Sequence, residues 1–462
     1  MERYDRQLRL WGALGQDSLN RSRVCVVGPA TPLLQEVFKN LVLAGISSLT
    51  WLKVECAVQS GSLFLAELKK DLEPLASKQL EYEENDLRKT LQQPQYDWTR
   101  FSVVILTCIG EQTAMFDLNE IRRQRGTKFP PVLNTFVSGF YGYIYLVLSE
   151  THFVLQAHPD SKKYDLRLQN PWPELINYVD TFDLSKMDTA TFSGIPYTVL
   201  LMKCIAKLER DGNNGRITID QMKKVLDQIC LPLGNDVIYE PNYVEAKRYA
   251  YLACSQNDCC KELEDLLRNL EISDYGNDWH DTYNYEILTL LLTLKNIAKE
   301  NGELSFQPLT GTLPDMESTT ENYIRLKKLY EVKAKLDKSR VEESLARSKK
   351  IVSQDVLETF CSHYGEVRKI LPPKSDLLGI FSTSNALLDA LVMVQFWEQP
   401  AVTAEDKDEF IGLRVDDNYS VMAFFGGAVV QEAIKLITHH YVPIDNLFLY
   451  NGINNSSATY KI

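Results

Sequence analysis

The turn after the first predicted strand is where a nucleotide-binding fold would hold phosphate. It reads Gly28-Pro29-Ala30-Thr31-Pro32-Leu33. A loop of the Gly-x-Gly-x-x-Gly type needs glycines for tight turning and backbone amides directed at the phosphates. Only the first glycine is present, and the two prolines have no amide hydrogen. The turn therefore argues against a bound nucleotide, although Glu55, after the second predicted strand, is the acid that could bind a ribose hydroxyl.

Cysteine and histidine show no pattern of a metal or nucleophilic site. The nine cysteines include no Cys-x-x-Cys pair, so neither a zinc site nor a disulfide framework is indicated. The segment Asp211–Ile217 has the composition of a calcium loop, but Arg210 stands where the first carboxylate ligand is required. Cys25 and Cys108 lie in predicted strands and are interpreted as core residues. We predict no metal site in this chain and a reduced, intracellular compartment.

Arg6 is the one side chain that we single out for chemistry, in the segment Tyr4-Asp5-Arg6-Gln7-Leu8-Arg9-Leu10-Trp11-Gly12. Three apolar residues in and just after this segment can share one helical face, namely Leu8, Trp11 and Leu14. Arg6 and Arg9 then lie on other faces. From the pattern alone, the ordinary interpretation is that Arg6 pairs with Asp5 or another nearby acid, since exposed arginines are common.

Composition and charge exclude several classes of protein. The 462 residues are 45% hydrophobic and 24% charged, which is ordinary for a globular protein of about two to four domains. A formal net charge of -12 would repel nucleic acid. The apolar stretch Ile287–Leu294 is far shorter than the about 20 residues that span a bilayer, and it indicates a buried helix. The amino terminus is charged and lacks a signal-peptide pattern, which indicates a chain that is not secreted. From the net charge and the short apolar stretch, we predict no nucleic acid and no membrane as partners.

Between residues 23 and 149, short β-rich runs alternate with helical segments, a pattern typical of parallel βαβ units. The predicted strands are Arg23–Gly28, Ser48–Val54, Ser102–Cys108, Pro131–Thr135, Tyr143–Leu148 and Phe153–Gln156. The predicted helices are Pro32–Ala44, which Gly45 would cap, and Leu63–Glu84.

Helical segments with proline or glycine punctuation dominate from about residue 160 to Trp397. Among them, Glu321–Lys350 predicts one or two exposed helices whose basic excess is a solvated face. From Gly412 the early pattern returns, with a helix over Val421–Thr438 and a strand over Leu447–Tyr450. Two adjacent glycines inside that helix, Gly426 and Gly427, indicate a close backbone approach, which we interpret as helix-on-sheet packing.

These patterns predict an α/β protein with a doubly wound, Rossmann-like fold that is discontinuous in sequence. Residues 1–160 and 412–462 would form this fold, and residues 161–411 would form a mostly α-helical inserted domain.

The order of three motifs resembles the activating enzymes of ubiquitin-like proteins: Tyr4–Gly12, then Lys39–Ile46, and later Gly426–Glu432. Within that family, the chain is most similar to the regulatory subunits of the heterodimeric enzymes for Rub or Nedd-type modifiers. The markers of this similarity are His158–Asp160, Asp165–Leu168, Pro171–Leu175, Gly311–Met316 and Ser457–Tyr460.

The resemblance implies that the two terminal parts form one ThiF-like adenylation fold, interrupted by a helical domain related to the catalytic-cysteine domain. In the family, a catalytic subunit uses ATP and magnesium to adenylate the carboxy terminus of the modifier, and then carries the modifier as a thioester. This chain departs from the catalytic pattern, because its glycine loop is degraded and Lys53 stands where active members place an acid. The resemblance therefore implies a catalytically incomplete regulatory subunit that binds no cofactor itself, with ATP and magnesium in the partner subunit.

The resemblance also changes the interpretation of Arg6. In this family, the arginine of the amino-terminal motif reaches across the dimer toward the γ-phosphate of ATP in the catalytic subunit, where a guanidinium would stabilise charge. The implied partners are the catalytic subunit and the Rub or Nedd-type modifier, in the cytoplasm and nucleus.

Three alternatives remain at this point. The first is the regulatory subunit for the SUMO-type modifier, which shares the amino-terminal motif but is usually shorter in the middle. The second is an NAD(P)-dependent oxidoreductase with a divergent Rossmann loop, which the βαβ pattern supports and the two prolines of the turn oppose. The third is a scaffold that contributes to no active site.

Overall fold

The structure is a computed structural model of the 462-residue chain. It describes residues 4–54, 68–76, 78–107, 121–157, 164–212, 215–254, 263, 265–270, 279–302, 306–372 and 418–461. The chain divides into two compact units. The first unit comprises Met1–Pro159, Tyr275–Tyr285 and Arg368–Ile462, and the second comprises Asp160–Asp274 and Glu286–Val367. The predicted domain boundaries at residues 160 and 411 lie outside the described residues.

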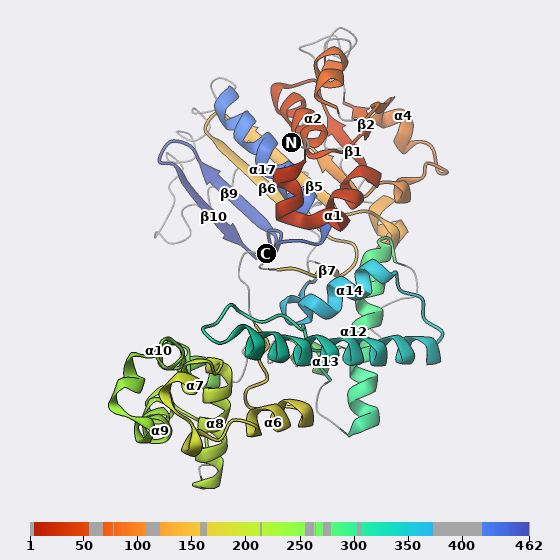
Figure 1. Ribbon diagram of the computed structural model, residues 1–462. Coiled ribbons are helices and arrows are strands. Elements are labelled where there is room, and N and C mark those ends of the chain that lie inside the picture. The colour runs from red at the N-terminus through yellow and green to blue at the C-terminus, as the bar shows by residue number, and fades with distance from the viewer. Residues whose placement is uncertain are drawn as a thin grey trace, which may run out of the picture. The chain divides into compact units, whose positions relative to one another are not determined.

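The first unit is built on an eight-stranded sheet with the order β10-β9-β6-β5-β4-β1-β2-β3 (Figure 1). Its strands are β1 (Arg23–Gly28), β2 (Ser48–Lys53), β3 (Glu81–Asp86), β4 (Val103–Leu106), β5 (Val132–Ser138), β6 (Tyr141–Val147), β9 (Leu447–Asn451) and β10 (Ser456–Tyr460). The strands β3, β2, β1, β4 and β5 are parallel to one another. Beyond them, the pairs β5–β6, β6–β9 and β9–β10 are antiparallel. The α/β class is confirmed, with a mixed sheet that continues past its parallel part.

One helix prediction and one strand prediction were wrong. Part of the helix expected over Leu63–Glu84 is the edge strand β3, and only residues 68–72 of that range are described as α-helical. As an edge strand, β3 pairs with β2 alone and stays partly exposed, so a polar sequence can form it. The segment expected to extend the sheet over Phe153–Gln156 instead contributes β7 (His152–Val154) to a separate two-stranded sheet with β8 (Arg368–Ile370).

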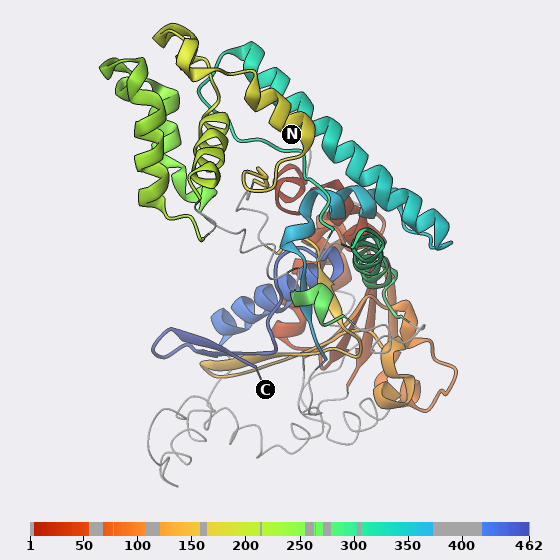
Figure 2. The same ribbon diagram turned by 90° about the horizontal axis from the view of Figure 1, so that it is seen from below.

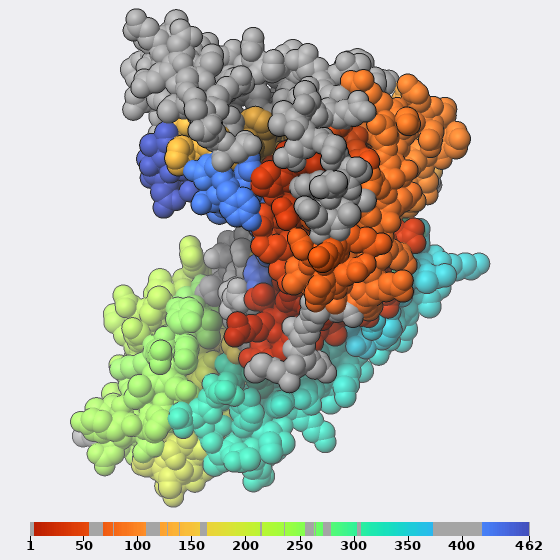
Figure 3. Space-filling view, turned by 90° about the horizontal axis from the view of Figure 1, so that it is seen from above, coloured from red at the N-terminus to blue at the C-terminus, as the bar shows by residue number. Residues whose placement is uncertain are grey.

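Three helices cover one face of the sheet: α1 (Asp5–Arg21), α2 (Pro32–Ala44) and α17 (Tyr419–Thr438). Figure 2 shows the sheet nearly edge-on with α17 along it, and in Figure 3 the red amino-terminal part of the chain meets the light blue of α17. The predicted bounds of α2 are confirmed, and Gly45 caps it in the left-handed conformation, with φ 104°.

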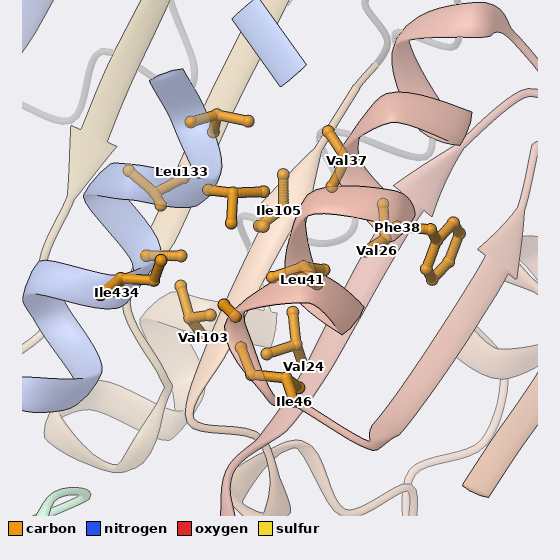
Figure 4. Close-up of a cluster of buried hydrophobic side chains, with 14 of the residues drawn as sticks. Val24, Val26, Val37, Phe38, Leu41, Ile46, Val103, Ile105, Leu133 and Ile434 are labelled. Carbon is orange, nitrogen blue, oxygen red and sulfur yellow. The ribbon is translucent and has the colours of Figure 1, made fainter. Parts of the chain in front are cut away.

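The core between these helices and the sheet consists mainly of aliphatic side chains. Figure 4 shows side chains of α2, among them Val37 and Leu41, and Ile434 of α17 meeting Val24 and Val103 of the strands. Each fully buried side chain of this size contributes roughly 1.5–3 kcal/mol to folding. This packing holds α1 and α2 on the sheet.

The close backbone approach expected at Gly426 and Gly427 exists at only one of the two. A Cβ on Gly426 would lie 2.6 Å from Cβ of Glu36 in α2, whereas nothing lies within 4 Å of one on Gly427. The close approach at Gly426 is therefore to helix α2, while α17 also packs on the sheet as expected. By length and composition α17 could also cross a membrane, but 61% of its most apolar window is buried, as in a core helix.

The opposite face of the sheet carries an aromatic cluster that includes Trp98, Phe101, Phe129, Tyr143 and Tyr145. The short helices α4 (Leu87–Leu91) and η2 (Trp98–Arg100) lie on this side. Trp98 contacts Phe129 and Phe101, with ring centroids 5.5 and 6.4 Å away. Both faces of the sheet are thus covered, as a doubly wound fold requires.

The second unit is helical. Its longer helices are α6 (Pro173–Asp180), α7 (Thr189–Ser193), α8 (Tyr197–Arg210), α9 (Ile219–Cys230), α10 (Pro241–Arg248), α13 (Thr320–Arg347) and α14 (Gln354–His363), and α12 (Thr282–Asn301) enters it from the first unit. The 3-10 helices among the described residues, besides η2, are η1 (Glu73–Leu75), η3 (Gly126–Lys128), η4 (Leu184–Lys186), η5 (Leu231–Leu233), η6 (Asn235–Tyr239), η7 (Ala250–Ala253) and η9 (Tyr364–Glu366). The basic segment forms one helix, α13, whose inner face buries Leu326, Tyr330 and Val341.

Candidate functional site

The turn between β1 and α2 offers few amides to an anion. The backbone N–H of Leu34 donates to the Thr31 hydroxyl over 3.3 Å, so this amide of the first turn is already used. Pro32, at the first helical position, has no N–H to give. Because phosphate binding at a helix amino terminus depends on free, converging amides, this turn does not fit a nucleotide phosphate.

Side chains at the carboxyl ends of the strands close the same region. The indole Nε1–H of Trp51 donates to the carbonyl oxygen of Gly28 over 2.9 Å. A side chain on Gly28 would collide with the Thr107 hydroxyl. Lys53, which occupies the expected position of an acid, forms an ion pair with Glu84 of β3. Glu55, the candidate for ribose binding, lies outside the described residues.

Arg6 lies on α1, and its side chain is exposed. The interpretation that it pairs with Asp5 is not what the structure shows, because Asp5 accepts from Arg9 over 3.0 Å. Within residues 4–54 and the other described ranges, no side chain forms a hydrogen bond or an ion pair with Arg6. The guanidinium is thus available to a ligand or a partner, and it could bind a phosphate through two N–H donors.

A break in α1 separates the part that carries Arg6 from the rest of the helix. Gly12 has φ 67° and ψ -177°, which is not helical and lies in the region that glycine tolerates. The predicted apolar face is therefore only partly formed, since Trp11 is buried while Leu8 and Leu14 are half-buried.

Two glutamines join α1 to the last turn of α2. Gln7 Nε2 donates to the carbonyl oxygen of Leu43, and Gln16 Nε2 donates to that of Ala44, each over 3.1 Å. Gln16 also accepts from the indole Nε1–H of Trp11 over 3.1 Å. The position of Arg6 is thus set by contacts that link both sides of the break in α1 to α2.

Sequence reasoning missed these contacts, as it missed the role of Trp51. Gln7 belongs to the amino-terminal motif, but nothing in the motif indicates that it bonds a carbonyl 36 residues away. The one local signal was Gly45, whose role as a helix cap was predicted. A Cβ there would lie 2.6 Å from Gln16 Nε2, so this glycine also permits the contact between the two helices.

The cysteines of the described residues are poor nucleophiles. Burial raises the pKa of Cys25 in β1 well above its usual value, and that of Cys361 in α14 to about 12. Cys108, Cys259 and Cys260 lie outside the described residues. In the part of the chain that the structure describes, no group of three or more His, Cys, Asp or Glu side chains could hold a metal ion.

Comparison with known proteins gives relatives along the entire chain, although no family model matches it. The NEDD8-activating enzyme E1 regulatory subunit of Xenopus laevis is 26% identical, covering 100% of this chain and 98% of its own length. The subunit of the same name from Danio rerio is 25% identical, with the same coverage. The NEDD8-activating enzyme E1 regulatory subunit AXR1 of Arabidopsis thaliana is 26% identical, covering 100% of this chain and 96% of its own.

A solved structure, that of E. coli MccB with succinimide, aligns with 33% of this chain and 49% of its own at 16% identity and a TM-score of 0.26. The end-to-end similarity to relatives from vertebrates and a plant agrees with the order of motifs along the sequence. The chain is thus similar along its whole length to the regulatory subunits of NEDD8-activating enzymes, the same group that its motifs resemble.

Proposed function

We propose that this chain is the regulatory, catalytically incomplete subunit of an activating enzyme for a Rub or Nedd-type modifier. It pairs with a catalytic subunit, which holds ATP and magnesium, adenylates the carboxy terminus of the modifier and forms the thioester for transfer to a conjugating enzyme. The end-to-end similarity to regulatory subunits supports this role. The closed turn after β1 supports it as well, because a chain without its own phosphate site depends on a partner for ATP chemistry.

In this proposal, residues 1–160 and 412–462 are the pseudo-adenylation domain. Residues 161–411 are the helical domain related to the catalytic-cysteine domain. The mixed sheet of the first unit and the helical second unit are compatible with this division.

The contribution of this chain to the chemistry is Arg6, extended in trans toward the γ-phosphate in the partner subunit. The observation that carries this proposal is that Arg6 is exposed and has no partner among the described residues, while the neighbouring arginine is engaged by Asp5. A guanidinium is always charged and donates in a planar fork that matches phosphate oxygens. It would oppose the negative charge on the phosphates while the acyl-adenylate forms.

The test measures modifier-dependent ATP-pyrophosphate exchange by the complex with the catalytic subunit. Arg6→Ala should lower the rate by about a hundredfold, the usual effect of losing one preorganised donor at a developing charge. Arg21→Ala is the matched control, because Arg21 is on the same helix, is 83% exposed and pairs only with Asp17. It should leave the rate unchanged.

An Arg6→Ala complex with normal substrate affinity and normal rate would show that Arg6 has no role in trans and would leave the scaffold alternative. Equilibrium binding of ATP, NADH and NADPH to the isolated chain tests the proposal that this chain holds no nucleotide itself. We expect no binding at micromolar concentration. Micromolar affinity for ATP would contradict a regulatory subunit, and micromolar affinity for a nicotinamide cofactor would favour an oxidoreductase.

A further inference from the structure

The last turn of α2 has carbonyl groups that its own helix cannot satisfy. The final carbonyls of any α-helix lack an intrahelical N–H, and they carry the negative end of the helix dipole. In α2, the amides of Gly45 and Ile46 bond back to Leu41 and Val42. The carbonyls of Leu43 and Ala44 need other donors.

These two carbonyls are the ones that the glutamines of α1 reach. Gln16 is 4% exposed and donates to Ala44, while Gln7 donates to Leu43. The two glutamines lie on opposite sides of the break at Gly12, so together they fix both parts of α1 on one helix end. The bond from Gln16 also satisfies the carbonyl of the buried Ala44, and a buried carbonyl left without a partner costs about 1–3 kcal/mol.

We propose that Gln16, assisted by Gln7, is a positioning residue that holds the first turns of α1 on the carboxyl end of α2 and so aims Arg6. The inference rests on the proposed function of Arg6 and adds the device that orients it. The backbone at Gly12 does not by itself hold the two parts of α1 in one orientation, because glycine lacks a Cβ and this one has φ 67°. Without the glutamine contacts, α1 before Gly12 would lose these hydrogen bonds and keep the packing of Trp11 and of Tyr4 beside Gly45.

The chain of contacts makes Gln16 the more important of the two glutamines. Its amide group bonds Ala44 with its nitrogen and Trp11 with its oxygen. Trp11 is 4% exposed and lies five residues after Arg6, in the same part of α1. Gln16 therefore connects the core, the carboxyl end of α2 and the segment that carries Arg6. Loss of this connection should therefore lower the exchange rate of the complex by no more than the loss of Arg6 itself does.

The test is a double-mutant cycle in the complex with the catalytic subunit, read as pyrophosphate exchange. Gln16→Leu keeps the bulk of the side chain and removes both hydrogen bonds, so the rate should fall by about tenfold, which lies in the range expected for the net loss of two hydrogen bonds. The double variant Arg6→Ala with Gln16→Leu should be no slower than Arg6→Ala alone, since residues that act through one another are not additive. Gln7→Leu, at a half-buried position, is the second variant in case Gln16→Leu does not fold.

A matched control and a second readout separate positioning from stability. Ser22→Ala removes a buried hydrogen bond of 2.8 Å to Leu19 at the other end of α1, and any effect of it should add to that of Arg6→Ala. In the isolated chain, amide hydrogen exchange over residues 4–12 should accelerate by about tenfold in Gln16→Leu and stay normal in Ser22→Ala.

The outcomes distinguish the two claims. A normal rate for Arg6→Ala overturns the proposed role of Arg6. A slow Arg6→Ala complex with a normal Gln16→Leu rate, or additive effects of the two changes, overturns the positioning role alone. Unchanged hydrogen exchange over residues 4–12 in both glutamine variants also overturns it.

Discussion

The imidazole of His439 lies 2.8 Å from the carboxylate of Asp281 through Nε2, and 2.5 Å from the carbonyl oxygen of Phe153 through Nδ1. Carboxylate and carbonyl oxygens accept hydrogen bonds, so each ring nitrogen of His439 faces an acceptor. The rings of His152 and Tyr283 stack on it, with centroids 4.6 and 4.3 Å away. These contacts join the end of α17 to the segment before α12 within the first unit.

The first prediction concerns Asp281→Asn. Burial acts to raise the pKa of Asp281, but the charge of His439 and the hydrogen bonds from His439 and the Tyr283 amide outweigh it and lower the pKa to about 2. A lowered carboxyl pKa stabilises the fold above the unfolded value near 4, and this contribution is lost as the pH falls toward 2. Since 32% of the Asp281 side chain is exposed, we expect a loss of about 1 kcal/mol.

Urea unfolding of the native chain and of Asp281→Asn at pH 6 and pH 3 measures this loss. The difference in unfolding free energy should shrink at pH 3. Asp17→Asn is the control, because Asp17 pairs with Arg21 at the surface. An equal difference at both pH values would contradict an ionised Asp281 as its cause.

A second prediction concerns Glu150, which is 6% exposed and accepts from the amides of His280 and Asp281 and from the Asn284 side chain. Burial raises the pKa of Glu150 to about 7, against these hydrogen bonds. The sign is opposite to that of Asp281. The contribution is complete below the unfolded value near 4.5 and is lost as the pH rises through 7, by about 3 kcal/mol in total.

Chemical denaturation between pH 5 and pH 8 checks this dependence. Glu150→Gln should be less stable than the native chain at pH 5, because an amide nitrogen replaces one acceptor oxygen. Its stability should then change less with pH. Parallel pH profiles for the two proteins would show that Glu150 does not titrate in this range.

A third prediction compares the two adjacent glycines of α17. Gly426→Ala should destabilise the first unit by about 1–3 kcal/mol, because the added methyl group meets Glu36 of α2 and overpacks the helix crossing. Gly427→Ala should stabilise it by up to about 1 kcal/mol, since alanine is the better helix former and nothing obstructs its Cβ. Thermal unfolding of the two variants measures the difference, and a loss of stability in Gly427→Ala would contradict it.

Local patterns predicted the elements that local forces determine. The buried run Arg23–Gly28 is a central strand, and α2 begins and ends where proline and glycine indicated. The polar strand β3 could not be predicted, because its structure depends on pairing with β2 and not on its own residues. For the same reason β7 left the main sheet, since its partner β8 lies more than 200 residues further along the chain.

In the candidate site, too, local features could be predicted from the sequence and contacts between distant residues could not. Missing glycines and amides were visible in the sequence of the turn, and the structure adds the Thr31 hydroxyl and the Trp51 indole that occupy the remaining groups. The exposure of Arg6 depends on a competition that sequence alone leaves open, namely whether Asp5 pairs with Arg6 or with Arg9. Helical geometry decides it, because Arg9 is four residues from Asp5 and one turn away.

A fourth prediction concerns thiol reactivity. Four cysteines of the described residues are buried, and Cys254 is half-buried. Burial raises the pKa of Cys230 and of Cys361 to about 12, so almost none of either thiol is ionised at pH 8. Alkylation of the native chain with iodoacetamide at pH 8, mapped by mass spectrometry, should label Cys254 at least about tenfold faster than Cys361. Equal labelling of the two in the folded chain would contradict the burial of Cys361.

The last prediction asks what closes the turn after β1. If the Thr31 hydroxyl were the group that excludes phosphate, then freeing the Leu34 amide from it would recover some affinity for nucleotide. Thr31→Ala frees the Leu34 amide and removes the helix cap, which should cost about 1 kcal/mol of stability. We expect no ATP binding to this variant by calorimetry, because Pro32 still lacks an N–H and Trp51 still holds the carbonyl of Gly28. Thr31→Ser retains the cap and serves as the control for stability. Measurable ATP affinity in Thr31→Ala, but not in Thr31→Ser, would mean that one hydroxyl blocks an otherwise intact phosphate site. A single substitution would then restore nucleotide binding to this chain.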